Sequence, residues 1–360
     1  MKKILFSLLL IAAILGACVA CAPAVTPVEG LVYESFGNGT CKLVSGTASN
    51  AYDLTVPTHS PEGDRVVAIG EGAFLGAKNL TRLTLPEGIE VIGKDAFRDC
   101  AALLSVAFPS TLKELGDGAF WGCSDLFSVR LPKGVEKIGA GVFAYCTDIT
   151  TLSMEEGGAY FEAGSNCIIR KADRTVVAGS SRAVLIGDVE HIAPHAFRGM
   201  ALSESFTVPA GVVSIGEGAF YGVSTVKSLF LPASLTEIES GAFGDNAALA
   251  SISVSVSNAT YQSAGNAILS KDGKILFVGC NATVIPRGVE EIAEGAFASL
   301  KRLTAITIPA SVEKIGAGAF RDCTFLATFA VEHTEEAFAA VEKGADWNLN
   351  CTFEVTYAQN

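Results

Sequence analysis

A period of 23 residues runs through most of this 360-residue chain and restricts it to folds built by stacking similar units. A Gly-x-Gly-Ala-Phe motif recurs with small variations, and its phenylalanines are Phe74, Phe97, Phe120, Phe143, Phe197, Phe220, Phe243, Phe297 and Phe320. Six of the eight spacings are 23 residues, and the other two are 54, which fits one repeat and an insertion of 31. Because a unit of this size cannot bury its apolar face alone, neighbouring units must stack. We predict nine repeats and two insertions of equal length.

Each column of the aligned repeats has a physical reading. The end of a unit, as in Leu83-Thr84-Leu85-Pro86, alternates apolar and polar residues and predicts a half-buried strand that proline stops. Ile89 and Ile92 are predicted to point inward from the opposite wall. The residue two before each Phe is Gly in seven units and Asp95 or His195 in the others, which predicts a left-handed backbone there. The columns together predict a right-handed solenoid with a parallel strand ladder on one wall.

The repeats resemble leucine-rich repeats of the BspA-like class of bacterial surface proteins, over Val66 to Thr334. The resemblance implies a β-rich solenoid, which leucine-rich-repeat convention assigns to the mixed α/β class, with hairpins inserted between repeats. It also implies a surface adhesin that binds host matrix or plasma proteins such as fibronectin and fibrinogen, or other bacteria. The sequence itself supports a long, rigid recognition surface, since a fold alone does not fix a function.

The first 17 residues have the features of a targeting segment. Two lysines precede an apolar run from Ile4 to Leu15, which is too short to span a bilayer. The run ends in Leu15-Gly16-Ala17-Cys18, which resembles the lipobox of bacterial lipoproteins and implies cleavage before Cys18 and a lipid anchor on it. Lipidation of Cys21 and an ordinary secretory signal are the alternatives. Residues 18–30 are predicted to form a tether, so the mature chain is expected in the bacterial envelope, with the outer membrane or cell surface as its place.

Segments outside the repeats are predicted to be caps and hairpins. Residues 31–65 form an N-terminal cap that begins with a hairpin around Gly37-Asn38-Gly39, residues 66–334 form the solenoid, and residues 335–360 form a C-terminal cap. In that last cap, a helix is expected over Glu335 to Lys343 and a strand over Cys351 to Tyr357, covering the open end of the solenoid.

The insertions at 158–188 and 258–288 resemble each other. We align Tyr160 of the first with Tyr261 of the second. The second insertion contains Asp272-Gly273 between two apolar runs, which predicts a hairpin.

Outward positions of the ladder strands are the candidate binding face. Twelve of these eighteen positions are Ser or Thr, and none is Asp, Glu, His or Cys. A surface without an acid, a base or a metal ligand is not catalytic, whereas arginines and aromatic residues commonly anchor interfaces. Exposed strands also favour Ser and Thr for structural reasons alone. We call the following candidates the ladder face: Arg82, Thr84, Ser105, Ser128, Arg130, Thr151, Ser153, Ser205, Thr207, Ser228, Phe230, Ser251, Ser253, Thr307 and Thr328.

Charge argues against binding to nucleic acid. The chain has 26 Lys and Arg against 38 Asp and Glu, a net charge of −12, so little basic surface is left to neutralise phosphates. Regularly spaced glutamates are expected to form a solvated face on the opposite wall, with weak Ca²⁺ binding as an alternative that no EF-hand-like loop supports. They are Glu87, Glu90, Glu114, Glu136, Glu190, Glu237, Glu290 and Glu313.

Cysteines, histidines and glycine-rich strings give no strong sign of a metal, a cofactor or catalysis. Four cysteines share one repeat column with Ala, Met, Val and Leu, which favours buried free thiols over a ladder of disulfides. They are Cys100, Cys123, Cys146 and Cys323. A cap disulfide between Cys323 and Cys351 is left open. His191 aligns with Lys137 and His195 with a turn glycine, so they do not share a helix face as metal ligands. The glycine strings lack the Lys-Ser/Thr of a phosphate loop.

We therefore expect a non-enzymatic, lipid-anchored binding protein, with a protein ligand and no cofactor. An envelope or periplasmic scaffold that binds another bacterial protein is the alternative, since it would use the same surface. An enzyme would need acid and base residues clustered on the insertions or caps, and the aspartates there are scattered: Asp173, Asp188, Asp272 and Asp346.

Overall fold

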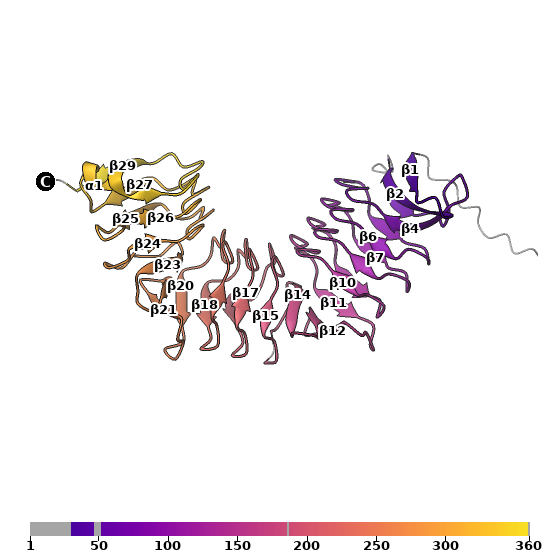
Figure 1. Ribbon diagram of the computed structural model, residues 1–360, viewed down its shortest axis with the longest axis horizontal. Helices are drawn as coiled ribbons and strands as arrows, with labels where there is room; N and C mark the ends of the chain where they lie inside the picture. The colour runs from indigo at the N-terminus through magenta and orange to yellow at the C-terminus, as the bar shows by residue number, and fades with distance from the viewer. Residues whose placement is uncertain (1–29, 47–51, 186, 359–360) are drawn as a thin grey trace, which may run out of the picture.

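The computed structural model describes residues 30–46, 52–185 and 187–358, which form an arc of stacked turns (Figure 1). The predicted signal segment, Cys18, Cys21 and the tether lie outside these residues, apart from Gly30. Within the described ranges, no helix is long and apolar enough to cross a bilayer. The chain is a β-solenoid with almost no helix, as the repeats predict.

Strands of the ladder face occupy the first wall of the solenoid. They pair in parallel and in register, as Thr151 does with Ser128 of the preceding unit. The ladder is divided into four sheets, a division that the repeat pattern did not indicate. The sheets are β3 (Asp53–Thr55), β5 (Arg82–Thr84) and β7 (Ser105–Ala107); β9 (Ser128–Leu131) and β11 (Thr151–Met154); β16 (Ser205–Thr207), β18 (Ser228–Leu231) and β20 (Ser251–Val254); and β25 (Ala305–Ile308), β27 (Thr328–Val331) and β29 (Glu354–Tyr357).

The second wall also forms parallel ladders, which come in addition to the predicted ladder on the first wall. Its strands have two residues each, and in each the second residue points into the core, as Ile138 does beside Leu115. These strands are β6 (Val91–Ile92), β8 (Glu114–Leu115), β10 (Lys137–Ile138), β15 (His191–Ile192), β17 (Ser214–Ile215), β19 (Glu237–Ile238), β24 (Glu291–Ile292) and β26 (Lys314–Ile315).

The motif phenylalanines stack along the core. Rings of successive units lie nearly parallel, with centroids 5.2 Å apart for Phe74 and Phe97 and 4.9 Å apart for Phe297 and Phe320. The residue two before each of these nine phenylalanines has a φ between 52° and 65°, including Asp95. The predicted left-handed position is therefore confirmed.

Caps at both ends extend the ladders. The N-terminal hairpin of β1 (Leu31–Ser35) and β2 (Thr40–Gly46) is confirmed, and β4 (Arg65–Ile69) joins it to β6. The helix α1 (Glu335–Ala340) is shorter than predicted, because Glu342 and Lys343 form β28, which pairs with β26. The final strand is β29, and it pairs with β27. The caps and the insertions add turns of their own, so the number of nine repeats remains a prediction.

Each insertion is a three-stranded unit whose last strand joins the second wall. The first contains β12 (Phe161–Gly164), β13 (Cys167–Arg170) and β14 (Thr175–Gly179), and the second contains β21 (Tyr261–Ala264), β22 (Ala267–Ser270) and β23 (Ile275–Val278). The predicted Asp-Gly hairpin is the turn between β22 and β23. The alignment of Tyr160 with Tyr261 was wrong by one residue: Phe161 is the counterpart, because it is buried whereas Tyr160 is 51% exposed.

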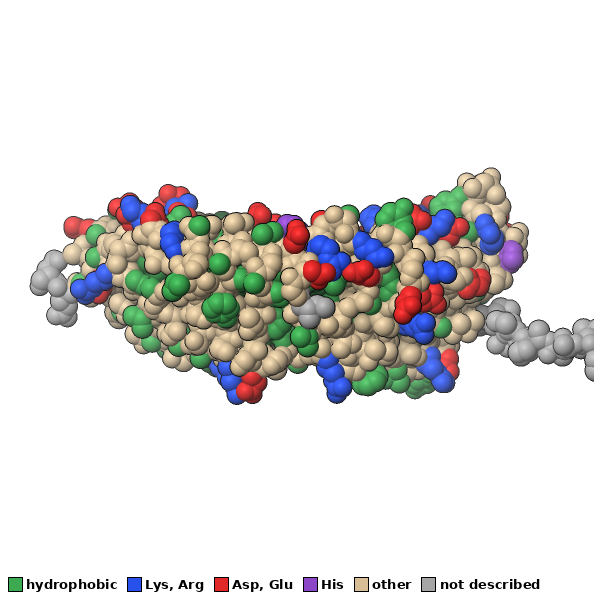
Figure 2. Space-filling model, turned by 90° about the horizontal axis from the view of Figure 1, so that it is seen from below, with side chains coloured by type: hydrophobic (Ala, Val, Ile, Leu, Met, Phe, Trp, Pro, Cys, Tyr) green, Lys and Arg blue, Asp and Glu red, His purple; other side chains and the backbone are tan. Residues whose placement is uncertain are grey.

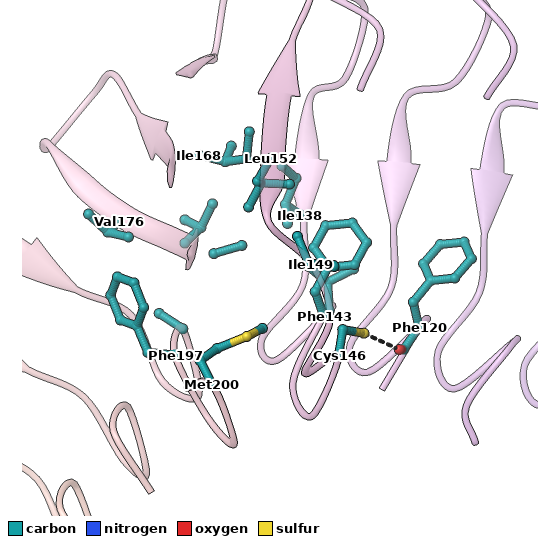
Figure 3. Close-up of a cluster of buried hydrophobic side chains, with 14 of the residues drawn as sticks. Phe120, Ile138, Phe143, Cys146, Ile149, Leu152, Ile168, Val176, Phe197 and Met200 are labelled. Carbon is teal, nitrogen blue, oxygen red and sulfur yellow. Dashed lines mark hydrogen bonds between the residues drawn. The ribbon is translucent and has the colours of Figure 1, made fainter. Parts of the chain in front are cut away.

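The insertions act as wedges that bend the solenoid. On the inner edge of the arc the turns meet directly across each insertion, since Tyr145 N donates to Arg198 O (2.8 Å) and Asp245 N to Ala298 O (3.2 Å). Deeper in the core, β14 separates Phe143 from Phe197 (Figure 3), and Gly179 N donates to Ala196 O. The hairpin strands β12 and β21 lie towards the outer side of the arc (Figure 1).

Candidate functional site

The ladder face is exposed, as the sequence predicts. Of the fifteen candidates, thirteen are exposed, and Ser153 and Ser228 are half-buried. Their side chains point outward because the intervening residues, such as Val129 and Leu229, are buried in the core. Phe230 keeps 42% of its surface exposed, which is unusual for an aromatic side chain on a strand.

The two arginines of the ladder face differ in their partners. Arg82 forms a two-point ion pair with Asp53 of β3, with Nε–Oδ1 at 2.8 Å and Nη2–Oδ2 at 2.7 Å. The guanidinium lowers the pKa of Asp53. Arg130 is exposed, and within the described ranges it has no ion-pair partner. The cap strand β3 therefore adds a carboxylate to a surface for which the sequence predicted none.

An exposed apolar column borders the ladder face, and our reading of the sequence missed it. Tyr52, Leu104 and Phe127 come directly before ladder strands and are 71%, 51% and 59% exposed. Backbone bonds join this column: Leu104 N donates to Thr81 O, and Phe127 N to Leu104 O. Because Phe127 directly precedes β9, the strand that carries Arg130, aromatic and cationic groups occur on neighbouring parts of one strand, as they do at protein interfaces. The signal was present in the repeat alignment, where this column is otherwise polar or small.

The second wall is charged, and many of its charges pair between neighbouring units. Lys137 Nζ lies 2.6 Å from Glu114 Oε1, and Lys113 Nζ lies 3.1 Å from Glu90 Oε2. Figure 2, which views the outer side of the arc, shows most charged side chains along one long margin, smaller charged groups along the other, and extensive neutral surface between them. Exposed pairs of this kind contribute little to stability. Within the described residues, no three His, Cys, Asp or Glu side chains are grouped to hold a metal ion.

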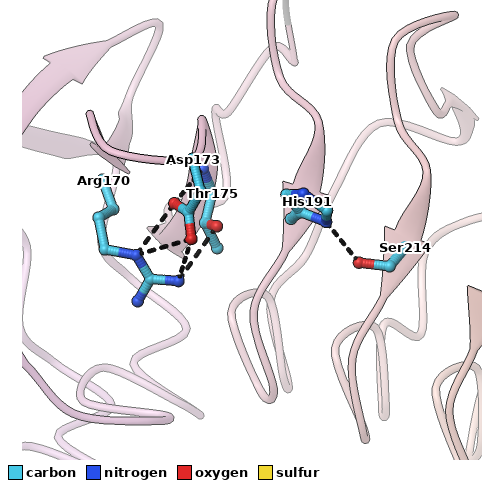
Figure 4. Close-up of polar contacts among 5 residues, drawn as sticks. All are labelled: Arg170, Asp173, Thr175, His191 and Ser214. Carbon is cyan, nitrogen blue, oxygen red and sulfur yellow. Dashed lines mark hydrogen bonds and ion pairs between the residues drawn. The ribbon is translucent and has the colours of Figure 1, made fainter.

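Polar residues gather where the first insertion interrupts the second wall (Figure 4). They line a hollow of about 360 Å³ beside β10. Arg170 holds Asp173 by Nε and Nη2 and lowers the pKa of that carboxyl, and Thr175 accepts a further bond from Arg170. His191 Nδ1 lies 2.8 Å from Ser214 Oγ. Each of these five side chains therefore has a hydrogen-bond partner within the group.

The two histidines do not converge. His191 belongs to β15, whereas His195 lies in the following turn, where its ring centroid is 5.7 Å from that of Trp121. Burial, followed by the nearby Arg198, lowers the pKa of His195.

Comparison with known families supports what the geometry indicates. The family model described as "BspA type Leucine rich repeat region (6 copies)" matches residues 61–170, 190–323 and 271–350, well over half of the chain. The chain belongs to this BspA-type family. Comparison with curated proteins gave no match.

The fold is similar to those of solved leucine-rich-repeat proteins. One from Eubacterium ventriosum has a TM-score of 0.57 at 18% identity, covering 90% of this chain and 93% of that one. A leucine-rich cell surface protein from Faecalibacterium prausnitzii is 21% identical, with a TM-score of 0.45 and coverages of 87% and 96%. At such identities the similarity supports the fold alone. The support comes from the Eubacterium ventriosum protein, whose TM-score is 0.57.

The cysteine column of this BspA-type solenoid consists of free thiols that bond to the preceding unit. Cys100 Sγ donates to Phe74 O at 3.2 Å, and Cys123 Sγ to Phe97 O at 3.2 Å. Cys323 and Cys351 do not pair either, because their thiols donate to Phe297 O and Phe320 O. All eight cysteines within the described ranges are free.

We expect these buried thiols to resist alkylation. Burial raises the pKa of Cys323 to about 12, so very little reactive thiolate exists near neutral pH. In a fragment from Thr26 to Asn360, iodoacetamide should modify the half-buried Cys351 at least about 100-fold faster than Cys323. Mass spectrometry after partial labelling measures both rates, and unfolding in urea should abolish the difference. An intact mass lower by two hydrogens per pair would show disulfides and contradict the assignment.

Proposed function

We propose that this BspA-type protein is a non-enzymatic, lipid-anchored surface protein whose ladder face recognises a host matrix or plasma protein. The observation that carries the proposal is the face itself, which is long, neutral and lined with hydroxyl groups. Arg130, Phe230 and the Phe127 column supply the aromatic and cationic anchors on which interfaces depend. The family assignment agrees with a protein-binding role.

Anchoring is proposed at Cys18, with residues 18–30 as the tether, residues 31–65 and 335–360 as caps, and residues 66–334 as the solenoid. This arrangement would hold the arc away from the membrane. A lipid on a single cysteine would hold the protein at the membrane through the acyl chain that it buries in the bilayer. In this proposal the anchor and the ladder face are therefore separate elements. Metabolic labelling with a fatty-acid analogue, lost in Cys18→Ala and kept in Cys21→Ala, tests the anchor.

Binding to immobilised fibronectin, fibrinogen and laminin tests the ligand class, using the fragment from Thr26 to Asn360. We expect saturable binding that persists at moderate salt and weakens at least about tenfold when Arg82, Arg130 and Phe230 are together changed to alanine. The matched control changes Lys113, Lys137 and Tyr160 to alanine, two cations and one exposed aromatic residue away from the ladder face. It should bind as the unchanged fragment does.

If none of the three proteins binds, the adhesin proposal fails, and an envelope scaffold with the same face takes its place. Protease treatment of intact cells separates the two locations. A surface protein is cleaved, whereas a periplasmic one is protected until the outer membrane is opened.

A further inference from the structure

The ladder face is interrupted before β25, and the interruption leaves a groove. Residues 283–287 of the second insertion run beside β25, in the place of a ladder strand. Within the described residues, no backbone hydrogen bond joins this segment to β25, whose one ladder neighbour is β27. The space between them is a hollow of about 430 Å³, and a second hollow of about 750 Å³ continues from it towards Tyr357. These volumes are in the range of ligand-binding sites.

The backbone of β25 is unpaired along this groove. In the regular ladder, the outward residues bond to the preceding strand, as Thr328 N does to Thr304 O at 3.1 Å. Ala305 occupies the same column as Thr328 one unit earlier, and Thr307 shares its side of the strand. Their N–H and C=O groups therefore face the groove, where the described residues offer them no backbone partner. Such an edge is a template for a further strand.

Side chains around the groove supply both apolar contact and charge. Val284 is 73% exposed, and Pro286 and Pro309 also line the hollow. Arg287 and Glu332 meet across the groove at 3.0 Å, but the guanidinium side chain remains 84% exposed. An arginine has five donors, and Glu332 occupies few of them. A carboxylate on an incoming chain would therefore complement Arg287.

We propose that this groove binds an extended segment of a partner protein by strand addition along β25. The backbone of the segment would pair with Ala305 and Thr307, its apolar side chains would cover Val284, and an acidic side chain would contact Arg287. Main-chain pairing gives affinity, and the flanking side chains give selectivity. The inference rests on the proposed binding function and places one contact of the partner on the last sheet of the ladder face.

Panning a displayed library of random linear peptides against the full chain tests the groove without knowledge of the natural partner. The decisive variant is Thr307→Pro, which removes the N–H that faces the groove and leaves the pairing of β25 with β27 in place, since proline is tolerated on such an edge. Selected peptides should be acidic and apolar and should lose about tenfold or more in affinity for this variant. They should also slow hydrogen exchange of the amides at 305 and 307.

Two controls separate the backbone contact from other effects. Thr307→Ala keeps the N–H and should retain binding, and Thr207→Pro makes the same change at the edge of β16, where affinity should stay unchanged. Arg287→Ala, which changes a side chain that is 84% exposed, should weaken the binding of acidic peptides selectively. A thermal unfolding curve for Thr307→Pro confirms that the variant is folded.

A library that yields no binder, or peptides that bind Thr307→Pro and the unchanged chain equally, would overturn the proposal. Self-association of the full chain that Thr307→Pro abolishes would also overturn it, because the occupant would then be a second copy. Host-protein binding that depends on Arg130 and Phe230 but not on Thr307 would leave the proposed function standing and refute the groove alone.

Discussion

Replacing Phe120 by alanine should lower the free energy of unfolding by about 3–5 kcal/mol, because it empties the centre of the aromatic stack. Phe120 is fully buried and lies between Phe97 and Phe143, with ring centroids 5.3 and 5.8 Å away. The ring of Phe108 also packs edge-on against it at 5.7 Å. Each unit contacts only its neighbours, so no distant part of the solenoid can compensate for the cavity. Urea unfolding followed by circular dichroism measures the loss.

The matched control is Phe127→Ala, which changes a phenylalanine seven residues later in the same repeat. Phe127 is 59% exposed and makes no ring contact with the stack, so its removal should change stability by no more than about 0.5 kcal/mol. Equal effects of the two changes would show that the stack does not stabilise the core. If Phe120→Ala gives two unfolding steps in place of one, the units on either side of it have become separate folding blocks.

Replacing Gly179 by alanine should destabilise the wedge by about 3 kcal/mol, the upper part of the usual range for overpacking. A Cβ atom at this position would lie 1.8 Å from Cε1 of Phe197, and that ring is fully buried. Neither can move far, because Gly179 N is bonded to Ala196 O and the Phe197 ring stacks on Phe220 at 5.2 Å. Urea unfolding gives the loss of stability, and small-angle X-ray scattering should show a changed bend.

Gly164→Ala is the control within the same hairpin. Its Cβ would meet Cδ1 of Ile169 at 3.7 Å, an ordinary contact, so stability should be unchanged or rise by less than about 1 kcal/mol. A Gly179→Ala protein as stable as the Gly164→Ala protein, with an unchanged scattering curve, would refute the role of the close approach. Gly279, whose Cβ would lie 2.1 Å from Phe297, is the same test in the second insertion.

Repetition explains why most of the fold could be predicted from the sequence. A column that holds the same kind of residue in every unit reports its environment many times over, as the left-handed position before Phe97 and Phe197 shows. The same reasoning could have found a second left-handed column two residues after each Phe, where φ lies between 53° and 75°. That column holds mostly Gly and Asp, with Tyr145 and Ser299 as exceptions.

What the sequence could not show was the geometry at the insertions. The sequences of the two insertions do not indicate which edge of the solenoid the insertions widen. That depends on the direct contact of Tyr145 with Arg198, while β14 enters the core. Two of the three breaks in the ladder, before β16 and before β25, lie at the insertions, and so does the groove beside β25, whereas the break between β7 and β9 lies within regular repeats. For the candidate site, alternation predicted which residues face outward, but the pairing of Arg82 with Asp53 joins residues that are 29 apart, outside the period of 23.

The constant register between units has a consequence for how such a chain can change in length. Lys137 pairs with Glu114 just as Lys314 pairs with Glu291, so each unit presents one surface to the unit before it and a matching surface to the unit after it. If a whole unit were duplicated or deleted within one uninterrupted run of repeats, the units on either side would still present matching surfaces to each other. The molecule would lengthen or shorten by about 4.8 Å per unit without altering its two ends or its bends. Genetic recombination between repeats could thus adjust the length of the protein in fixed steps, while the remaining units keep their structure.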